Sequence, residues 1–325
     1  MTISIQTIST ARSTRSSVPA PTETDPAGAA PVVHDRLTPD LADFARGLVA
    51  AATAADGVSP LAEQAVHAID SGVEDGVRHV VSDVGYANVL AGRGGEPAMV
   101  EAVVGPDARR RGHGRALLTV ALDVARELVA DPSPRAWAHG DLPGAVALAA
   151  SLGLRRRREL LRLRRPLGPE ADELPALEVD DSLVLRTYAG SADDAEILRV
   201  NNAAFDWHPE QGGWTTAQIT ERVNSSWFDP DGLFLAFDAG DPQRLLGFHW
   251  TKRHDAELGE VYIVGVDPDA QGRGLGRLLT LAGLHHLADR GMAEVELYVE
   301  GDNTAALHTY HRLGFTQYAI DVAYG

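Results

Sequence analysis

The stretch Val266-Asp-Pro-Asp-Ala-Gln-Gly-Arg-Gly-Leu-Gly-Arg277 is a glycine-dense turn between two apolar runs. The run Val261–Val266 enters the turn and the run Leu278–Ala288 leaves it, which indicates a strand, a loop and a helix. Unpaired backbone amides at such a helix start favour a pyrophosphate. The glycines alternate, unlike the Rossmann spacing, and the ending of a P-loop is absent. Taken alone, the motif could also be a glycine-rich surface turn.

The same pattern occurs 162 residues earlier, as Val104-Gly-Pro-Asp-Ala-Arg-Arg-Arg-Gly-His-Gly-Arg115. A β-like run, Met99–Val104, enters this copy, and an apolar run, Ala116–Val129, leaves it. Further on, Gly140-Asp141 matches Gly301-Asp302 at an offset of 161. A tandem repeat explains these matches, and its alternating strands and helices predict an α/β layer fold in each half.

The second copy continues with a further strand and a short helix. Ala293–Val299 reads as the strand, and a helix is expected near Thr304–Leu313. Asn303 is a candidate cap at the start of this helix, and Gly314 is its expected stop.

Changes in composition divide the chain into four parts. Residues 1–34 are rich in Ser, Thr, Pro and Ala, which predicts a disordered tail. Prolines and acidic residues mark a linker at 166–181. We therefore expect one domain over 35–165 and a second domain over 182–325.

The overall composition excludes several classes of protein. The net charge is −17, with 46 acidic and 29 basic side chains, which disfavours nucleic acid as a partner. The chain has no cysteine and hence no thiolate metal site, and His308 and His311 have no third ligand beside them, so we expect no metal. No apolar run approaches the ~18 residues of a membrane span. These features favour a cytoplasmic monomer that binds small molecules and no membrane.

Two motifs, in the same order, resemble the GNAT superfamily of acyl-CoA-dependent N-acyltransferases: the glycine loop and Glu300-Gly-Asp-Asn-Thr-Ala-Ala-Leu-His-Thr-Tyr-His-Arg-Leu-Gly-Phe315. The resemblance implies two tandem GNAT-type domains, each with a mixed central β-sheet flanked by helices, and acetyl-CoA as the acyl donor. It also implies a set of CoA-binding positions, most of them in the second half. These are Val264, Gly265, Val266, Gln271, Gly272, Arg273, Gly274, Leu275, Gly276, Arg277, Asn303, Thr304, Ala305, Ala306, Leu307 and His308, with Ala102, Val103 and Val104 in the first half.

The tandem arrangement and several further segments resemble the mycothiol synthase family over roughly residues 38–324. Examples are Arg199-Val-Asn-Asn-Ala-Ala-Phe205, His208-Pro-Glu-Gln-Gly-Gly-Trp214 and Leu246-Gly-Phe-His-Trp-Thr-Lys252. The resemblance implies acetyl transfer to the cysteinyl amine of cysteinyl-glucosaminyl-inositol. It further implies a cleft between the domains, lined by acceptor-binding residues from both of them. These are Glu63, Glu210, Lys252, Glu260 and Tyr298.

Only the second half carries a candidate base and a candidate acid for acetyl transfer. The resemblance implies that Glu260 is the base and Tyr310 the acid, whereas the first copy has Ala98 and Ala149 at offsets of 162 and 161. We therefore expect the C-terminal domain to be catalytic and the N-terminal domain to be degenerate, either still holding CoA or without a ligand. A strand-end glutamate and a core tyrosine are the structural alternatives.

Two other functions remain compatible with the sequence. The chain could be a GNAT N-acetyltransferase with another small-molecule or peptide amine as acceptor. It could also be a noncatalytic acyl-CoA sensor, which would bind CoA without turnover.

Overall fold

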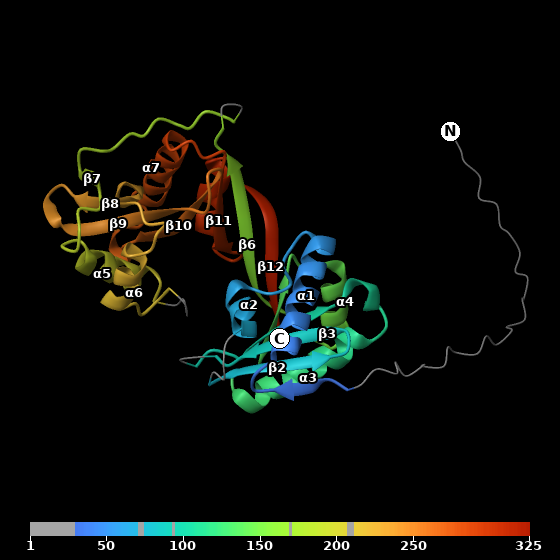
Figure 1. The fold of residues 1–325 in the computed structure, drawn as a ribbon. Helices are drawn as coiled ribbons and strands as arrows, with labels where there is room; N and C mark the ends of the chain where they lie inside the picture. Colours follow the sequence, from blue (N-terminus) through green and yellow to red (C-terminus); the bar gives the residue numbers. More distant parts are fainter. Residues whose placement is uncertain (1–29, 71–74, 93–94, 169–170, 207–210) are drawn as a thin grey trace, which may run out of the picture.

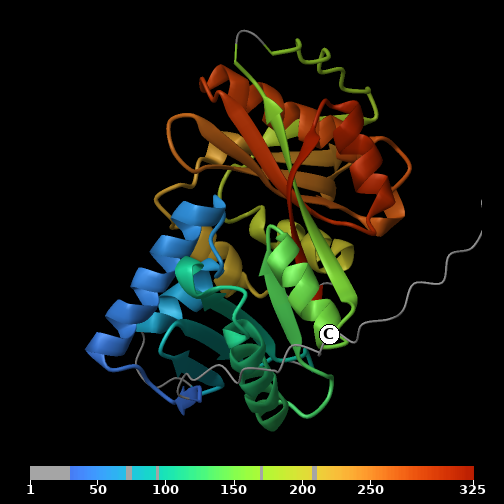
Figure 2. The ribbon, with the colours of Figure 1, turned by 90° about the vertical axis from the view of Figure 1, so that its right-hand side faces the viewer.

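The computed structural model describes residues 30–70, 75–92, 95–168, 171–206 and 211–325. Over these residues, twelve strands form one sheet in the order β1-β2-β3-β4-β5-β12-β6-β11-β10-β9-β8-β7. Helices pack on both faces of each half of this sheet (Figure 1 and Figure 2). The expected α/β class, with mixed strands flanked by helices in both halves, is confirmed.

The first half of the chain builds one end of the sheet. β1 to β4 are antiparallel, and β5 is parallel to β4. Helices α1 and α2 pack on one face and α3 packs on the other. The elements are β1 (Val32–His34), α1 (Pro39–Asp56), α2 (Glu63–Asp70), β2 (Val77–Ser82), β3 (Gly85–Leu90), β4 (Met99–Val104), α3 (His113–Leu128), β5 (Arg135–His139), α4 (Pro143–Ser151) and β6 (Arg156–Pro166).

The second half repeats this order of elements. β7 to β10 are antiparallel, and β11 is parallel to β10. The elements are β7 (Leu183–Thr187), α5 (Asp194–Ala204), α6 (Thr216–Val223), β8 (Leu233–Asp238), β9 (Asp241–Arg253), β10 (Leu258–Val266), α7 (Leu275–Asp289), β11 (Glu294–Glu300), α8 (Thr304–Arg312) and β12 (Thr316–Tyr324). The strands and helices expected around both glycine loops are confirmed within a few residues.

The start of the ordered chain differs from the expectation. Residues 1–29 of the expected tail lie outside the described part, but Val32–His34 pair with Val81, Val80 and His79 of β2. Composition alone missed this short strand because three residues are too few to show an alternating pattern.

The two halves exchange their last strands. β6, which follows the first copy of the repeat, lies between β11 and β12, and β12 lies between β5 and β6. Figure 1 shows β6 and β12 side by side where the two lobes meet. As a result, Leu163 of β6 is fully buried in the core of the second half, and Val322 of β12 packs with Ala149 of α4. Neither half of the sheet is complete without a strand from the other.

The exchanged position of β6 predicts which strands a mutation in its core residue will destabilise. Leu163→Ala should cost about 2–5 kcal/mol, as is typical for a buried leucine. Hydrogen exchange followed by mass spectrometry should then show faster exchange in β11, although Leu163 precedes the linker in the sequence. Leu122→Ala in α3, whose side chain is buried in the core of the first half, is the matched control. If the Leu163 variant showed faster hydrogen exchange only in β2, β3 and β4, the result would contradict the placement of β6 in the second half.

Candidate functional site

The glycine loop leaves open space at the start of α7. Gly272 and Gly274 have φ angles of +78° and +77°, and a Cβ at either residue, or at Gly276, would meet no atom within 4 Å. Gly274 is the N-cap of α7, and the described structure shows no side-chain cap there. Because the first amides of a helix have no acceptor within it, this N-terminus can bind an anion.

Next to this loop, β10 and β11 separate. They pair at only three positions within the described residues, ending at Glu260 and Glu296, although both strands continue. Beyond that point β10 is paired only with β9, through a bulge at Tyr262. The edge of β10 around Val264 to Val266 therefore lies open toward β11, and its backbone groups can bind an extended ligand.

The first copy keeps the loop, and a small apolar cavity lies beside its two parallel strands. Arg110, the counterpart of Gly272 (272 − 162 = 110), has a φ of +63°, and Gly112 is the N-cap of α3 with a φ of +90°. Between β4 and β5 lies an apolar cavity of about 70 Å³, with Ala102 and Leu148 among its lining residues. Cδ2 of Leu148 also lies 3.4 Å from the place of a Cβ at Gly114, so its side chain packs against this loop, whereas the counterpart Gly276 has open surroundings.

Glu260 is buried beside a histidine. Its side chain is on the sheet face opposite α7, because its neighbour Val261 packs in the core under α7. Glu260 is only 6% exposed, and its Oε2 lies 2.9 Å from Nε2 of His254. This hydrogen bond raises the pKa of His254, and the charge of Glu296 adds to the effect, against burial and the charge of Lys252. The hydrogen bond from Nε2 of His254 therefore holds the Glu260 side chain in one orientation.

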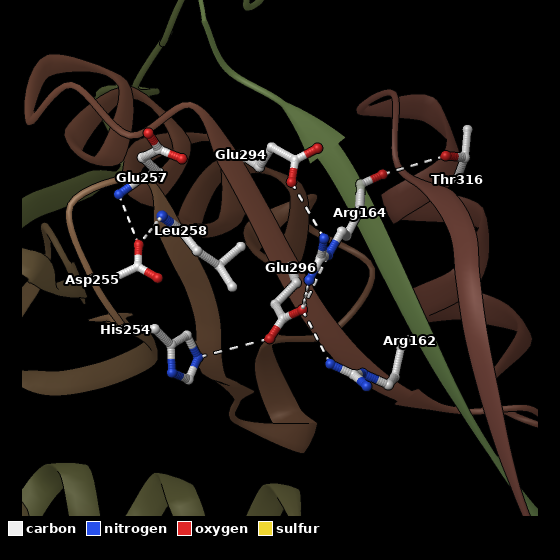
Figure 3. A network of polar contacts seen from close by, with 9 residues as sticks. All are labelled: Arg162, Arg164, His254, Asp255, Glu257, Leu258, Glu294, Glu296 and Thr316. Atoms are coloured by element: carbon white, nitrogen blue, oxygen red, sulfur yellow. Dashed lines mark hydrogen bonds and ion pairs between the residues drawn. The ribbon is translucent and has the colours of Figure 1, made fainter. Parts of the chain in front are cut away.

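The neighbouring carboxylate, Glu296, forms ion pairs with two arginines of β6. It is 3% exposed, and its Oε2 lies 3.1 Å from Nη2 of Arg164 and 3.4 Å from Nη2 of Arg162. Figure 3 shows both arginines reaching from β6 to this one side chain, with His254 on its other side. A buried carboxylate is costly unless it is paired, so the exchanged strand makes Glu296 tolerable next to Glu260.

Tyr310 lies on the other side of the sheet, on α8. Its ring packs edge-to-face with that of Phe315, with the ring centroids 5.7 Å apart. Tyr310 and Val264 pack against the same apolar cluster. Burial raises the pKa of Tyr310 to about 12, so the phenol stays protonated at neutral pH. Asn303 caps α8 by accepting a 3.1 Å hydrogen bond from the amide of Ala306, which confirms the expected cap.

The bulge in β10 corrects one sequence equivalence. Glu260 faces away from α7, and Met99 faces away from α3, because its neighbours Ala98 and Val100 pack in the core with α3. Upstream of Tyr262 the offset between the halves is therefore 161 (260 − 161 = 99; 296 − 161 = 135), and Glu260 pairs with Glu296 as Met99 pairs with Arg135. The counterpart of Glu260 is therefore Met99 rather than Ala98. Either residue lacks a carboxylate.

A cavity of about 380 Å³ lies between the halves and contains two of the expected acceptor residues. Glu63, at the start of α2, and Tyr298, on β11, both line it. Lys252 is paired with Glu260 across the strands, and its Nζ lies 5.3 Å from the ring of Trp227 and 5.5 Å from that of Tyr262. Glu210 lies outside the described residues.

Motif reasoning missed His254, Glu296 and the two arginines of β6. A signal was present, because acidic residues alternate at 294, 296 and 300 and arginines alternate at 158, 162 and 164, as side chains on one face of a strand do. The sequence did not show that these two strands are neighbours.

The fold and the site together define a class of protein. A model of the acetyltransferase (GNAT) family matches residues 200–315. A GCN5-related N-acetyltransferase from Sphaerobacter thermophilus shares the fold with a TM-score of 0.68 at 24% identity, covering 91% of this chain and 95% of that one. A tandem GNAT protein from the clavulanic acid pathway has a TM-score of 0.55 at 24% identity, over 76% of this chain and 81% of that one. The chain is an acetyltransferase of the GNAT class.

Closer relatives identify the family. The mycothiol acetyltransferase of Gordonia bronchialis is 71% identical over 308 residues, which cover 95% of this chain and 98% of the relative. The mycothiol acetyltransferase of Nocardia farcinica is 57% identical over 297 residues, which cover 89% of this chain and 95% of the relative. The chain belongs to the mycothiol acetyltransferase family, as the sequence motifs indicated.

In the described part of the chain, no helix has the length and apolar character needed to cross a bilayer. The His, Asp and Glu side chains of the same part form no group of three or more suited to a metal ion.

The contact between His254 and Glu260 predicts a titration. The pKa of His254, followed by NMR of its imidazole, should lie above its ordinary value and should fall in Glu260→Gln, because the negative charge is lost. The stability that this pair contributes should be present at low pH and lost as the pH rises through the raised pKa. Glu257→Gln, an exposed change in the same turn, should leave the titration unchanged. An unaltered His254 pKa in Glu260→Gln would rule out the contact.

Proposed function

We propose that this protein transfers the acetyl group of acetyl-CoA to the cysteinyl amine of cysteinyl-glucosaminyl-inositol, which forms mycothiol. The single observation that carries the proposal is 71% identity to a mycothiol acetyltransferase over nearly the whole length of both chains. The geometry agrees with it, since an open glycine loop, a gap between parallel strands and a buried carboxylate lie close together.

The donor fits the second half of the chain. In this proposal the amides from Gln271 to Arg277 bind the pyrophosphate of CoA at the N-terminus of α7, where no Cβ blocks the approach at the three glycines. The open edge of β10, from Val264 to Val266, holds the pantetheine arm, and the start of α8, from Asn303 to His308, borders it. Acetyl-CoA supplies the acetyl group as a thioester.

Glu260 is proposed to take the proton from the acceptor ammonium. It suits this role because the hydrogen bond to His254 orients it, and because it lies where β10 and β11 separate. His254 reaches solvent, with a side chain 32% exposed, so the proton has an exit from the buried site. Transfer forms the amide bond, breaks the thioester bond and releases one proton to water.

Tyr310 is proposed to protonate the departing CoA sulfur. Its raised pKa keeps the proton on the phenol until a thiolate needs it. Its place on α8, among the residues that pack with Val264, puts it on the opposite side of the strand gap from Glu260. An acid on one side of the sheet and a base on the other suit a reaction at the gap between them.

We propose that residues 182–325 form the catalytic domain and that residues 35–165 form a degenerate one, with 166–181 as the linker. Met99 and Ala149 occupy the places of the base and the acid in the first half, and the cavity between β4 and β5 is small. Ala102, Val103 and Val104 would then at most hold a second CoA without turnover.

The acceptor is proposed to lie in the cavity between the halves. Glu63 and Tyr298 line this cavity, and Lys252 and Glu260 continue the same sheet face beyond it. These carboxylates, an ammonium and an aromatic face suit a substrate that carries one amine and many hydroxyl groups.

The proposed chemistry predicts losses of rate with retained binding. In Glu260→Gln and Tyr310→Phe, kcat should fall about 100- to 10,000-fold, the usual range for a lost general base or acid. The affinity for acetyl-CoA, measured by calorimetry, should stay within a few-fold of the wild type. Mass spectrometry of the acceptor after incubation with acetyl-CoA scores one acetyl group on the cysteinyl nitrogen.

The same assay separates the rival functions. Rapid acetylation of another amine, with none of the cysteinyl amine, would favour a different acceptor. Tight binding of acetyl-CoA with no acetylation of any amine would favour a sensor.

The glycine loop predicts a specific loss of CoA affinity. Gly274→Ala should weaken acetyl-CoA binding at least about tenfold, because the left-handed φ becomes strained and the amides move. Gly291→Ala is the matched control, since Gly291 has a φ of +79° and equally open surroundings but lies after α7. Equal losses of affinity in the two variants would argue against the loop as the CoA site.

A further inference from the structure

The cavity between the halves holds a polar cluster at the end away from Glu260. Glu101 of β4, His139 of β5 and Asp321 of β12 all line it. Nε2 of His139 lies 3.1 Å from Oε1 of Glu101, and Nδ1 lies 3.5 Å from Oδ2 of Asp321. We call these three residues the carboxylate–histidine cluster. The chemistry proposed above does not use them.

The cluster is held in place from several elements. The amide of Ala62, just before α2, donates a 2.8 Å hydrogen bond to Oε2 of Glu101, and the amide of Gly140 donates one of 2.8 Å to Oδ1 of Asp321. Burial alone would lower the pKa of His139, but the bonds and charges of Asp321 and Glu101 outweigh it and raise the pKa to about 9. The imidazolium leaves the cluster with one net negative charge.

The carboxylates of this cluster have unused lone pairs that suit hydroxyl groups. A carboxylate has about four lone-pair positions, and each of these two carboxylates uses one oxygen for an amide and the other for the imidazolium. Lone pairs therefore remain to accept O–H donors from a ligand in the cavity. Both nitrogens of His139 face carboxylates, so the ring offers no lone pair to a metal ion.

The position of the cluster matches a long acceptor. Glu260, Glu296 and Tyr298 share one face of the sheet, and Asp321 lies on the same face two strands beyond β11. Three strand spacings, about 14 Å, separate β10 from β12 across the sheet. Asp321 also lies four residues, about 13 Å, further along the strands than the row of Glu260 and Glu296, so the two ends are about 19 Å apart. Tyr298, 43% exposed, stands between these ends with Arg162 over its ring at 5.1 Å. An acceptor with its amine at Glu260 can therefore lay one ring along Tyr298 and extend a second ring to the cluster.

We propose that Glu101, His139 and Asp321 form the subsite that recognises the hydroxyl groups of the acceptor's terminal polyol ring, the inositol. The carboxylates accept hydrogen bonds from neighbouring hydroxyls, and His139 holds both carboxylates at a fixed spacing. The inference rests on the proposed function. It assigns the terminal ring to strands of both halves, β4 and β5 of the first and β12 of the second.

The test compares two acceptors. The probes are cysteinyl-glucosaminyl-inositol and cysteinyl-glucosamine, which lacks the terminal ring, each with saturating acetyl-CoA. The wild type should show a KM at least about tenfold lower for the full acceptor. Asp321→Asn and His139→Gln should raise KM for the full acceptor about 10- to 100-fold with kcat within a few-fold, and should leave KM for the truncated acceptor unchanged.

Arg156→Gln is the matched control for a merely structural role. Arg156 forms ion pairs with Asp141 and Glu159 close to the same strands but does not line the cavity. Its KM for both acceptors should equal that of the wild type. If Asp321→Asn and His139→Gln fail to fold, as thermal unfolding would show, the ratio of the two wild-type KM values still tests the proposal. Equal values would overturn it.

Three outcomes are informative. Selective loss with the full acceptor supports the subsite. Equal KM values of the wild type for both acceptors, or equal losses with both in the variants, would overturn the subsite while leaving the proposed function standing. Acetylation of neither acceptor by the wild type would overturn the proposed function, and the subsite with it.

Discussion

The pairing of β6 with β11 and β12 is the contact on which the rest of the structure depends. It joins two repeats into one sheet and buries Leu163 in the core of the half to which it does not belong in sequence. It also brings Arg162 and Arg164 to Glu296, whose buried charge would otherwise be unpaired. Loss of both arginines would leave a buried carboxylate unpaired, which is costly, so the exchanged strand and the site carboxylates are energetically coupled.

This pairing also sets the form of the functional site. The sheet is paired along both edges of β6, and it opens one strand further on, where β10 and β11 separate after Glu260. The gap lies beside the start of α7, so the proposed anion site, the proposed slot for an extended chain and the proposed base are contiguous. The cavity proposed to hold the acceptor then follows from the joining of the halves, since its lining comes from both of them.

The sequence was sufficient for features that depend on local order. Glycines at 272 and 274 predicted a turn, which the structure forms with positive φ at both residues, and Asn303 predicted a cap, because each depends on a few adjacent residues. The pairing between distant strands could not be predicted, because the residue pattern of β6 does not specify which strands lie next to it. The carboxylate–histidine cluster was missed for the same reason, since three separate strands supply one residue each. The bulge at Tyr262 shifted the equivalence of Glu260 by one residue, which an ungapped repeat cannot show.

The central claim is that two repeats make one catalytic centre, in the second half, with an acceptor cavity built from both. A crystal structure of the protein with CoA and the acceptor tests this claim most directly. The account predicts the CoA sulfur in the gap beyond Glu260, the acceptor amine facing Glu260 and the acceptor rings between Glu63 and Tyr298. A CoA sulfur seated between β4 and β5 with the acceptor amine near Met99, or an acceptor bound outside the cavity, would contradict it.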